Sequence, residues 1–206
     1  RQKKFSSFAA KIVVLSKNYG SHPAVRAGFQ HATAPNCIWL GADLQEPLEI
    51  IGKAYEKMKE GYDLICIQKN SVKVSKSEEC FSRIYSNLIR KYAIPGYPRK
   101  GVNTIFFNEK VKNQLNQNVE LNSSVVLQVL NQGFRKAVIN VDYKERKHGE
   151  SKWSFRKKLK LLIDSIVSFS FFPIRLVSLI GILFAFAGFL TALYLIILKI
   201  FQIKEV

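Results

Sequence analysis

The sequence predicts an α/β domain followed by an amphipathic helix and one membrane-spanning helix. Short β-branched runs alternate with segments of helical periodicity through most of the chain. Basic and apolar residues then share one helical stretch, and the apolar run that follows it, residues 176–198, has no charged side chain. We therefore divide the chain into a sheet domain (1–150), a juxtamembrane helix (151–170), a transmembrane helix (171–200) and a tail (201–206).

The first half of the sheet domain reads as strand, helix, strand, helix, strand. Strands are expected at residues 11–15 (KIVVL), 37–40 (CIWL) and 63–67 (DLICI), with helices after Ser21 and Pro47. This order is typical of a parallel sheet, which binds ligands beyond the carboxyl ends of its strands. The polar segment that follows the second strand is therefore expected at the ligand-binding edge.

The second half of the domain is less regular. A helix is expected at residues 79–93, a strand at 104–107, a helix at 123–130 and a further strand at 136–143. Pro and Gly residues separate the first two of these elements. Together these elements supply one ordinary domain core.

The juxtamembrane segment has an apolar stripe, and basic residues are concentrated in its first helical turns. The apolar residues recur at helical spacing and suit a helix that lies in the lipid headgroup layer, although a helix packed on the sheet would show the same spacing. The membrane-interface residues are expected to be Arg156, Lys157, Lys158 and Lys160, and they predict a cytoplasmic location for this side of the chain. The uncharged run of about 23 residues beyond them is long enough to cross a bilayer.

The formal net charge of +17 needs a polyanionic partner or surface. Nucleic acid is excluded as the expected partner, because the charge is spread along the chain without zinc-finger spacing, a recognition helix or an aromatic RNA-binding pattern. A basic segment beside an apolar span points instead to membrane lipid and to phosphate-bearing substrates. The three cysteines also lack zinc-site spacing.

The segment 41–49 (GADLQEPLE) is the best candidate for a reaction centre. Asp43 and Gln45 place a carboxylate and an amide oxygen two positions apart, just past a buried strand. Mg²⁺ takes one or two protein carboxylates and completes its shell with water and substrate phosphates, so these residues suit a divalent metal. The alternative is that Asp43 only caps the helix that follows.

Five segments, in order, resemble the inverting A-type family-2 glycosyltransferases that act on polyprenyl phosphates, the group of dolichyl-phosphate mannose synthase and the undecaprenyl-phosphate sugar transferases. Residues 41–51 (GADLQEPLEII) resemble the family's DADLQDPPELI, and residues 15–20 (LSKNYG) its LSRNFG. Residues 61–63 match its GYD. The last two are Arg146 with residues 149–153 (GESKW), and residues 168–175 (SFSFFPIR), which resemble the lead-in to a membrane helix.

The resemblance implies an incomplete A-type, Rossmann-like glycosyltransferase domain and gives particular residues a role. Asp43 would be catalytic by holding, with Gln45, the Mg²⁺ or Mn²⁺ that bridges the donor's pyrophosphate. Arg146, Lys147 and Lys152 would bind the acceptor phosphate, and a solvated basic loop is the alternative. The implied partners are a nucleotide-sugar donor, a polyprenyl phosphate and membrane lipid at the cytoplasmic membrane, and a homo-oligomer is compatible with the sequence.

The sequence also departs from the family pattern. Gly41 stands where relatives usually have the first Asp of the acidic motif, and Asn103 where they often have Asp. The strands ending in P-x-Y-N-E and D-D-G-S, which grip the nucleotide, and a second membrane helix are not found. We therefore expect a chain truncated at both ends, decayed, or completed by another polypeptide. The alternative function is a non-catalytic membrane protein that binds anionic lipid or a partner through its basic surface.

Overall fold

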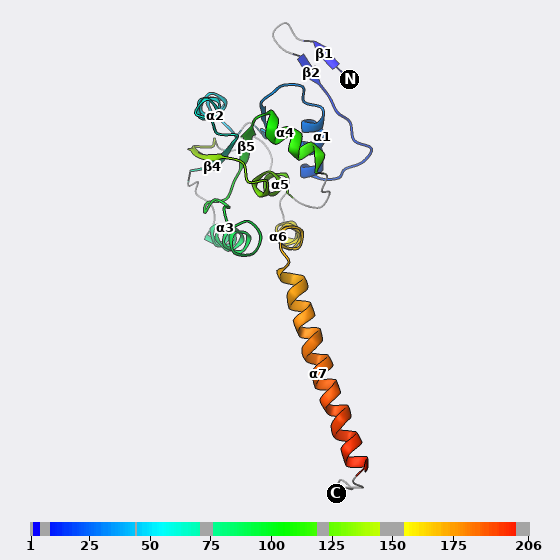
Figure 1. The fold of residues 1–206 in the computed structure, drawn as a ribbon. Helices are drawn as coiled ribbons and strands as arrows, with labels where there is room; N and C mark the ends of the chain where they lie inside the picture. The colour runs from blue at the N-terminus through cyan, green and yellow to red at the C-terminus, as the bar shows by residue number, and fades with distance from the viewer. Residues whose placement is uncertain are drawn as a thin grey trace.

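The computed structural model describes residues 2–4, 9–43, 45–70, 76–118, 124–144 and 155–200. Figure 1 shows a globular domain built on a small sheet, with one long helix leaving it. A separate antiparallel pair, β1 (Gln2–Lys4) and β2 (Ala9–Lys11), lies at the amino end. The expected strand at 11–15 is wrong, because β2 ends at Lys11 and the four-stranded sheet does not extend to this run. Val14 accordingly exposes 84% of its surface.

The central sheet has the strand order β3-β5-β4-β6. Its members are β3 (Cys37–Ile38), β4 (Leu64–Lys69), β5 (Thr104–Phe107) and β6 (Lys136–Val141). The β4–β6 pair is parallel, whereas β5 is antiparallel to both β3 and β4. The sheet is therefore mixed, and the expectation of a parallel sheet is wrong.

The direction of β5 follows from the path of the chain between β4 and β5. This path contains α3 (Lys76–Leu88) and the π-helical turn η1 (Ile89–Ala93), which together replace the single helix expected at 79–93. The chain then returns to the edge of the sheet at which β4 ended. There the backbone N–H of Asn103 donates to the carbonyl of Ile67 over 3.0 Å. The side chain of Gln68 donates to the carbonyl of Gly101 over 2.6 Å. The next strand has to run back across the sheet.

Helices cover both faces of the sheet. On one face α2 (Glu49–Lys59) buries Ile50 and Ala54 against Ile65 and Ile67 of β4. The other face carries α1 (Ser21–Gln30), α4 (Glu109–Gln117) and α5 (Val125–Asn131). α4 was not expected from the sequence. Its first turn is capped by Asn108, whose side chain accepts a hydrogen bond from the backbone N–H of Val111 over 3.2 Å.

A buried arginine joins the three helices of the second face. Arg26 of α1 is only 6% exposed. Its guanidinium donates to the side chain of Gln128 in α5 and to the carbonyls of Leu115 and Asn118, over 2.6 and 2.7 Å. Because these bonds lead to α5 and to the end of α4, one side chain fixes α1 against both helices.

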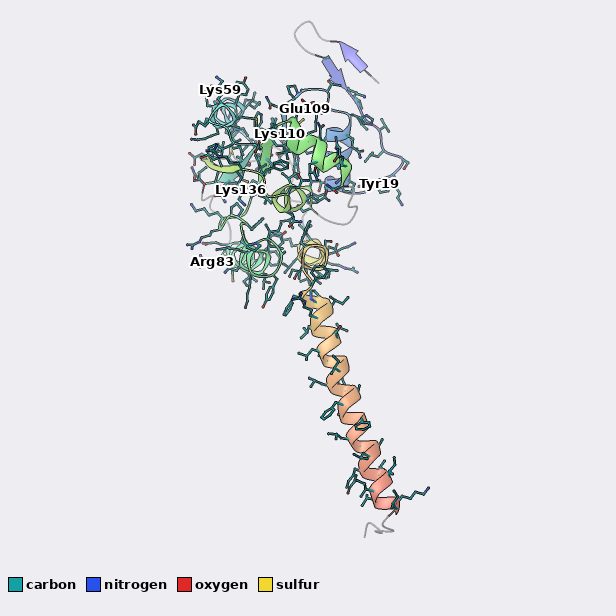
Figure 2. The ribbon with its side chains drawn as sticks, viewed as in Figure 1. Tyr19, Lys59, Arg83, Glu109, Lys110 and Lys136 are labelled. Carbon is teal, nitrogen blue, oxygen red and sulfur yellow. The ribbon has the colours of Figure 1, made fainter. Side chains whose placement is uncertain are left out.

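The chain ends in α6 (Phe155–Phe169) and α7 (Phe172–Ile200). α7 extends away from the domain, with side chains on all sides and no other described element against most of its length (Figure 2). It is long and apolar enough to cross a membrane, in agreement with the predicted span. The described part of the chain contains one such helix.

Candidate functional site

Three strands of the sheet end at the same edge. β3 and β4 are both antiparallel to β5, and β6 is parallel to β4, so β3, β4 and β6 all run in one direction. Asn70 and the segment 142–144 directly follow β4 and β6, and two residues separate β3 from the segment 41–46, of which residue 44 is not described. The carboxyl ends of three strands therefore share one edge even though the sheet is mixed, and ligand binding at this edge stays a prediction.

Hydrogen bonds hold these segments together. The backbone N–H of Lys144 donates to the carbonyl of Gln45 over 2.9 Å. The side-chain amide of Asn70 donates to Asp142 Oδ1, and the backbone N–H of Lys69 donates to Asn103 Oδ1, each over 2.9 Å. Segments from distant parts of the sequence thus meet along this edge of the sheet.

Asp43 and Glu46 bring two carboxylates to the α-carbon of Gly41. A β-carbon placed on Gly41 would lie 2.8 Å from Asp43 Oδ1, and 3.2 and 3.5 Å from the two carboxylate oxygens of Glu46. The backbone N–H of Gly41 also donates to Glu46 Oε2 over 3.3 Å. The space that a side chain would fill at Gly41 is therefore bordered by acidic oxygens from two residues, a donor set that suits a hard divalent cation.

Tyr143 adds a phenol to the same place. Its pKa is raised by burial, and further by the negative charges of Glu46 and Asp43. The phenol oxygen is buried and makes no hydrogen bond within the described part of the chain. Its ring lies 5.3 Å from Lys69 Nζ, a cation–π distance. The site thus combines carboxylates, a neutral phenol and a cation.

The structure places some of the predicted site residues here and does not describe others. Asp43 and Gln45 are both half-buried in the edge segment. The backbone of Gln45 is fixed by Lys144, while the binding of a cation by its side chain stays a prediction. Within the described residues no group of three or more His, Cys, Asp or Glu side chains gathers around one point. Arg146, Lys147 and Lys152 lie outside the described residues, and their role stays a prediction.

Glu46 was missed by sequence analysis. It stands five positions after Gly41, and sequence spacing does not show that its side chain folds back over that glycine. The sequence nevertheless contained a signal for Glu46, because this acidic residue closely follows Gly41, which stands at a position where the resemblance leads one to expect aspartate.

The juxtamembrane helix has two different faces. Leu162 and Ser165 are buried, and Ile166 and Phe169 pack against the domain core. Another face leaves Leu159, Ile163 and Val167 between 41% and 61% exposed. Arg156 and Lys160 are exposed, Lys158 is half-buried, and the side chain of Lys157 lies outside the description. One side of the helix therefore packs on the domain and a second apolar side with basic neighbours stays open, while the placement of that side in the headgroup layer stays a prediction.

A groove of about 370 Å³ lies between α3, α6 and the loop before β5. Asn103 lines it at the sheet edge, and Lys158 and Leu161 line it from α6. Lys100, Phe81 and Tyr85 also line the groove, so that its lining includes both cationic and apolar side chains. The groove therefore connects the sheet edge with the juxtamembrane helix.

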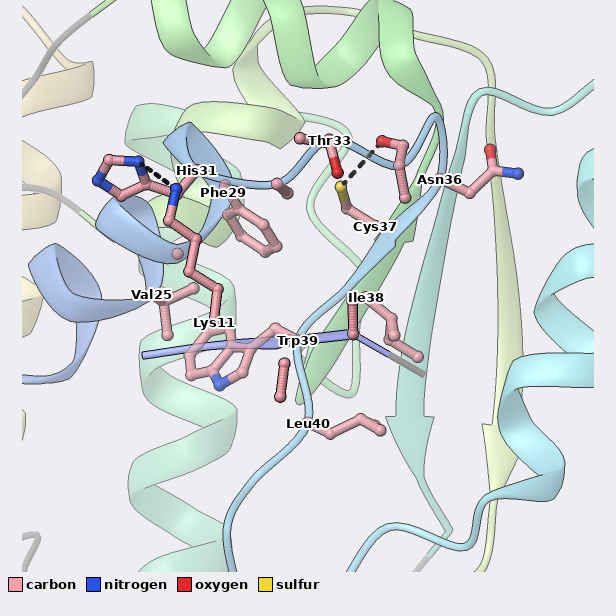
Figure 3. A pocket seen from close by; sticks show the side chains of 15 residues that line it. Lys11, Val25, Phe29, His31, Thr33, Asn36, Cys37, Ile38, Trp39 and Leu40 are labelled. Atoms are coloured by element: carbon pink, nitrogen blue, oxygen red, sulfur yellow. Dashed lines mark hydrogen bonds between the residues drawn. The ribbon is translucent and has the colours of Figure 1, made fainter. Parts of the chain in front are cut away.

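A larger cavity of about 630 Å³ lies beside β3, between α1 and β2 (Figure 3). Its lining includes Val25, Phe29 and Trp39 and contains no acidic side chain. Lys11 Nζ and His31 Nδ1 are 3.5 Å apart at one end of it. Without carboxylates this cavity does not suit a divalent cation, so the sheet edge remains the candidate site.

A family model described as glycosyl transferase family 2 matches residues 2–142. Since this is more than half of the chain, the chain belongs to glycosyl transferase family 2.

Curated relatives from several bacteria are similar to most of the chain. The undecaprenyl-phosphate 4-deoxy-4-formamido-L-arabinose transferase of Pseudomonas aeruginosa (strain LESB58) is 32% identical over 199 residues, which cover 93% of this chain and 57% of the relative. The protein of the same name from Proteus mirabilis (strain HI4320) is 30% identical over 188 residues, covering 91% and 58%. That from Klebsiella pneumoniae (strain 342) is 32% identical over 189 residues, also covering 91% and 58%. The chain thus spans somewhat more than half the length of these relatives.

Proposed function

We propose that this chain takes part in the transfer of a sugar from a nucleotide-sugar donor to a polyprenyl phosphate at the cytoplasmic face of a membrane. The observation that carries this proposal is the pair of carboxylates at the sheet edge of a family-2 domain that continues, through α6, into a bilayer-length helix. The names of the similar transferases, which specify undecaprenyl phosphate, support a lipid phosphate as acceptor.

The sheet edge is the proposed donor site. Asp43 and Gln45 would hold Mg²⁺ or Mn²⁺ there, and the convergence of acidic oxygens on Gly41 fits such an ion. The ion would neutralise the charge that develops on the leaving nucleotide diphosphate. Asp43 thereby acts on the reacting phosphates without transferring a proton.

The acceptor requires little further chemistry. A phosphate monoester has its second pKa near 6, so at neutral pH its oxygen is already a nucleophile. An alcohol acceptor would need a general base, whereas a phosphate needs mainly alignment and charge neutralisation. Arg146, Lys147 and Lys152 are proposed to supply these, and the groove lined by Lys100 and Lys158 offers a path from the membrane side to Asn103 at the sheet edge.

The juxtamembrane helix is proposed to hold the domain at the bilayer surface. Its open face, with Leu159, Ile163 and Val167, suits the boundary between headgroups and acyl chains. Arg156, Lys157, Lys158 and Lys160 would meet anionic headgroups, which are enriched on the cytoplasmic leaflet. A domain held in this way keeps the sheet edge within reach of a lipid-borne phosphate.

The test is sugar transfer by membranes from cells that make the protein at full length. Asp43→Ala should lower transfer by on the order of a hundredfold, because the departing pyrophosphate loses its counter-charge. Glu60→Gln is the matched control, since it also removes one carboxylate but lies at the far end of α2, paired with Lys57. Membrane content of each variant is measured by immunoblotting of washed membranes.

Two results would count against the proposal. Near-normal transfer by Asp43→Ala would reduce Asp43 to a structural residue of the loop. A parent protein that transfers no sugar but binds vesicles containing anionic lipid would favour the alternative, a non-catalytic lipid-binding protein.

A further inference from the structure

The start of α7 concentrates positive charge at the point where the apolar helix leaves the domain. Arg175 is the fourth residue of α7, and the first turn of this helix contains no acidic side chain. The amino end of a helix carries a partial positive charge of its own, so a cation at this end is unfavourable unless an anion lies close by. Ser170 offsets a part of this charge, because its side-chain oxygen accepts from the backbone N–H of Phe172 over 3.1 Å.

A second cation approaches the same place from η1. The ring of Tyr92 packs on the ring of Phe172, and the ammonium group of Lys91 lies 5.1 Å from the centre of the Tyr92 ring. Arg175 stands three positions after Phe172, so their side chains are neighbours on the surface of α7. Lys91 and Arg175 are both exposed, and neither forms an ion pair within the described part of the chain. Two cations from distant segments therefore flank one aromatic pair.

We propose that Lys91 and Arg175 together bind the phosphate of one anionic membrane phospholipid at the junction of η1 with α7. This inference rests on the part of the proposed function that places α7 in a bilayer. Aromatic rings are typical of the level at which headgroups meet acyl chains, which fits the position of Tyr92 beside the start of the apolar helix. Phe171 and Ile174 are 75% and 65% exposed, so they offer an apolar surface to the acyl chains of the same lipid.

This lipid differs from the proposed acceptor in place and in chemistry. Lys91 and Arg175 are not among the residues that line the groove between α3 and α6, which leads to the sheet edge. The phosphate of a bilayer phospholipid is a diester, which has no second ionisable oxygen to act as a nucleophile, whereas the proposed acceptor is a phosphate monoester. The bound lipid would therefore link η1 with α7 without taking part in sugar transfer.

The competing role for the two cations is to act as separate charges that keep the start of α7 on the cytoplasmic side. Separate charges attract any anionic headgroup, and the effects of removing them multiply. Two cations that hold one phosphate depend on each other, so the effects of removing them do not multiply. This difference can be measured with single and double variants.

The experiment measures binding of phosphatidylglycerol to the purified full-length protein in detergent by native mass spectrometry, with zwitterionic phosphatidylcholine for comparison. Lys91→Gln and Arg175→Gln should each weaken binding of the first phosphatidylglycerol about fivefold, the effect of one basic residue close to lipid phosphate. Arg175→Lys should bind nearly as the parent does, because it keeps the charge. Lys110→Gln is the matched control, since Lys110 is exposed on α4, away from α7 in Figure 2, and this variant should also bind as the parent does.

The double variant Lys91→Gln with Arg175→Gln should lose less than the product of the two single losses. Single variants that bind phosphatidylglycerol like the parent would overturn the inference, and so would losses that multiply. An equal loss in Lys110→Gln would also overturn it, because net charge alone would then explain the binding. Lys91 is exposed on η1, so Lys91→Gln tests the inference even where Arg175→Gln lowers the unfolding temperature. If the expected binding pattern is found but the parent transfers no sugar, the inference stands and the proposed transferase function fails.

Discussion

The ring of Tyr92 in η1 packs on the ring of Phe172 in the first turn of α7, with centroids 4.5 Å apart and planes tilted by 34°. η1 also contacts α6. α6 also contacts the start of α7, which runs on from α6 at this end of the domain in Figure 1. The start of α7 therefore contacts the domain both through the ring of Tyr92 and through α6.

This aromatic pair should contribute measurably to the stability of the domain–helix junction. In a double-mutant cycle of Tyr92→Ala and Phe172→Ala, we expect a coupling energy of about 0.5–1.5 kcal/mol, the usual range for packed aromatic rings. The measurement is chemical unfolding in detergent of the parent, the two single variants and the double variant. Strictly additive effects would show that the rings are neighbours without energetic coupling.

The topology of the chain can be tested by cysteine labelling in intact cells. Lys160 is exposed on α6, so a Lys160→Cys variant should resist an impermeant thiol reagent applied from outside and react only after the cells are opened. The background carries Cys80→Ser, because Cys80 is exposed whereas Cys37 and Cys66 are buried. Lys199→Cys, in the last turn of α7, is the matched position that should label from outside. Labelling in the opposite pattern would reverse the proposed orientation.

Stability should depend on pH through Cys66. Burial raises the pKa of the Cys66 thiol to about 12, against an ordinary value of 9.0, and the smaller effect of the nearby Lys136 charge lowers it. Above pH 9 the unfolded thiol loses its proton while the folded one keeps it, so the stabilisation is present below pH 9 and is lost as the pH rises from 9 to 12. The loss is about 1.4 kcal/mol per pH unit in this window.

The measurement for Cys66 compares the pH dependence of the unfolding free energy in the parent and in Cys66→Ala. The variant should lose less stability than the parent as the pH rises, although it starts lower because a buried side chain has been shortened. Cys80→Ser should follow the parent, since Cys80 is exposed. Parallel curves for the parent and Cys66→Ala would contradict the prediction.

The proposed acceptor-phosphate cluster can be tested by changing the shape of the side chain at position 146 while keeping its positive charge. An Arg side chain can engage two phosphate oxygens at once and a Lys side chain cannot, so Arg146→Lys should impair use of the polyprenyl phosphate and Arg146→Ala should impair it more. Both variants should keep donor binding. The measurement is the dependence of transfer on acceptor concentration at low and moderate salt.

A solvated basic loop would give a different result for Arg146. Lys would then substitute fully, and the effect of Ala would fade as salt screens exposed charges. Arg146→Lys behaving like the parent at both salt concentrations would remove Arg146 from the phosphate site.

The sequence alone predicted the elements with strong periodicity. The helices that bury Phe29, Ile50 and Val129, and the strand at the centre of the sheet, were expected close to where they occur. α4 was missed because most of its residues are polar, and its anchoring by buried Val111 and Leu115 becomes clear only when the helix meets the sheet. The direction of β5 depends on long-range contacts such as that of Gln68 with Gly101, which local patterns do not contain.

Only some residues of the candidate site could be predicted from the sequence. Asp43 and Gln45 were chosen because their oxygen chemistry and their place after a strand are visible in the sequence. Glu46 was not chosen, because sequence spacing does not show that its side chain folds back over Gly41, five positions earlier. Tyr143 was not chosen, because it approaches Asp43 and Glu46 only through folding between segments about a hundred residues apart.

The parallel pairing of β4 with β6 bears on the order in which the protein is made and folded. The bond between Asn70 and Asp142 at the end of this pair closes a sequence separation of 72 residues. Such distant contacts form slowly, because the chain loses much conformational freedom before the contact repays it. Synthesis runs from the amino end, so β6 leaves the ribosome before α7 does. β6 can therefore pair with β4 before synthesis of α7 is complete. This order shortens the time during which unpaired strands and the apolar residues of α7 are exposed to solvent together.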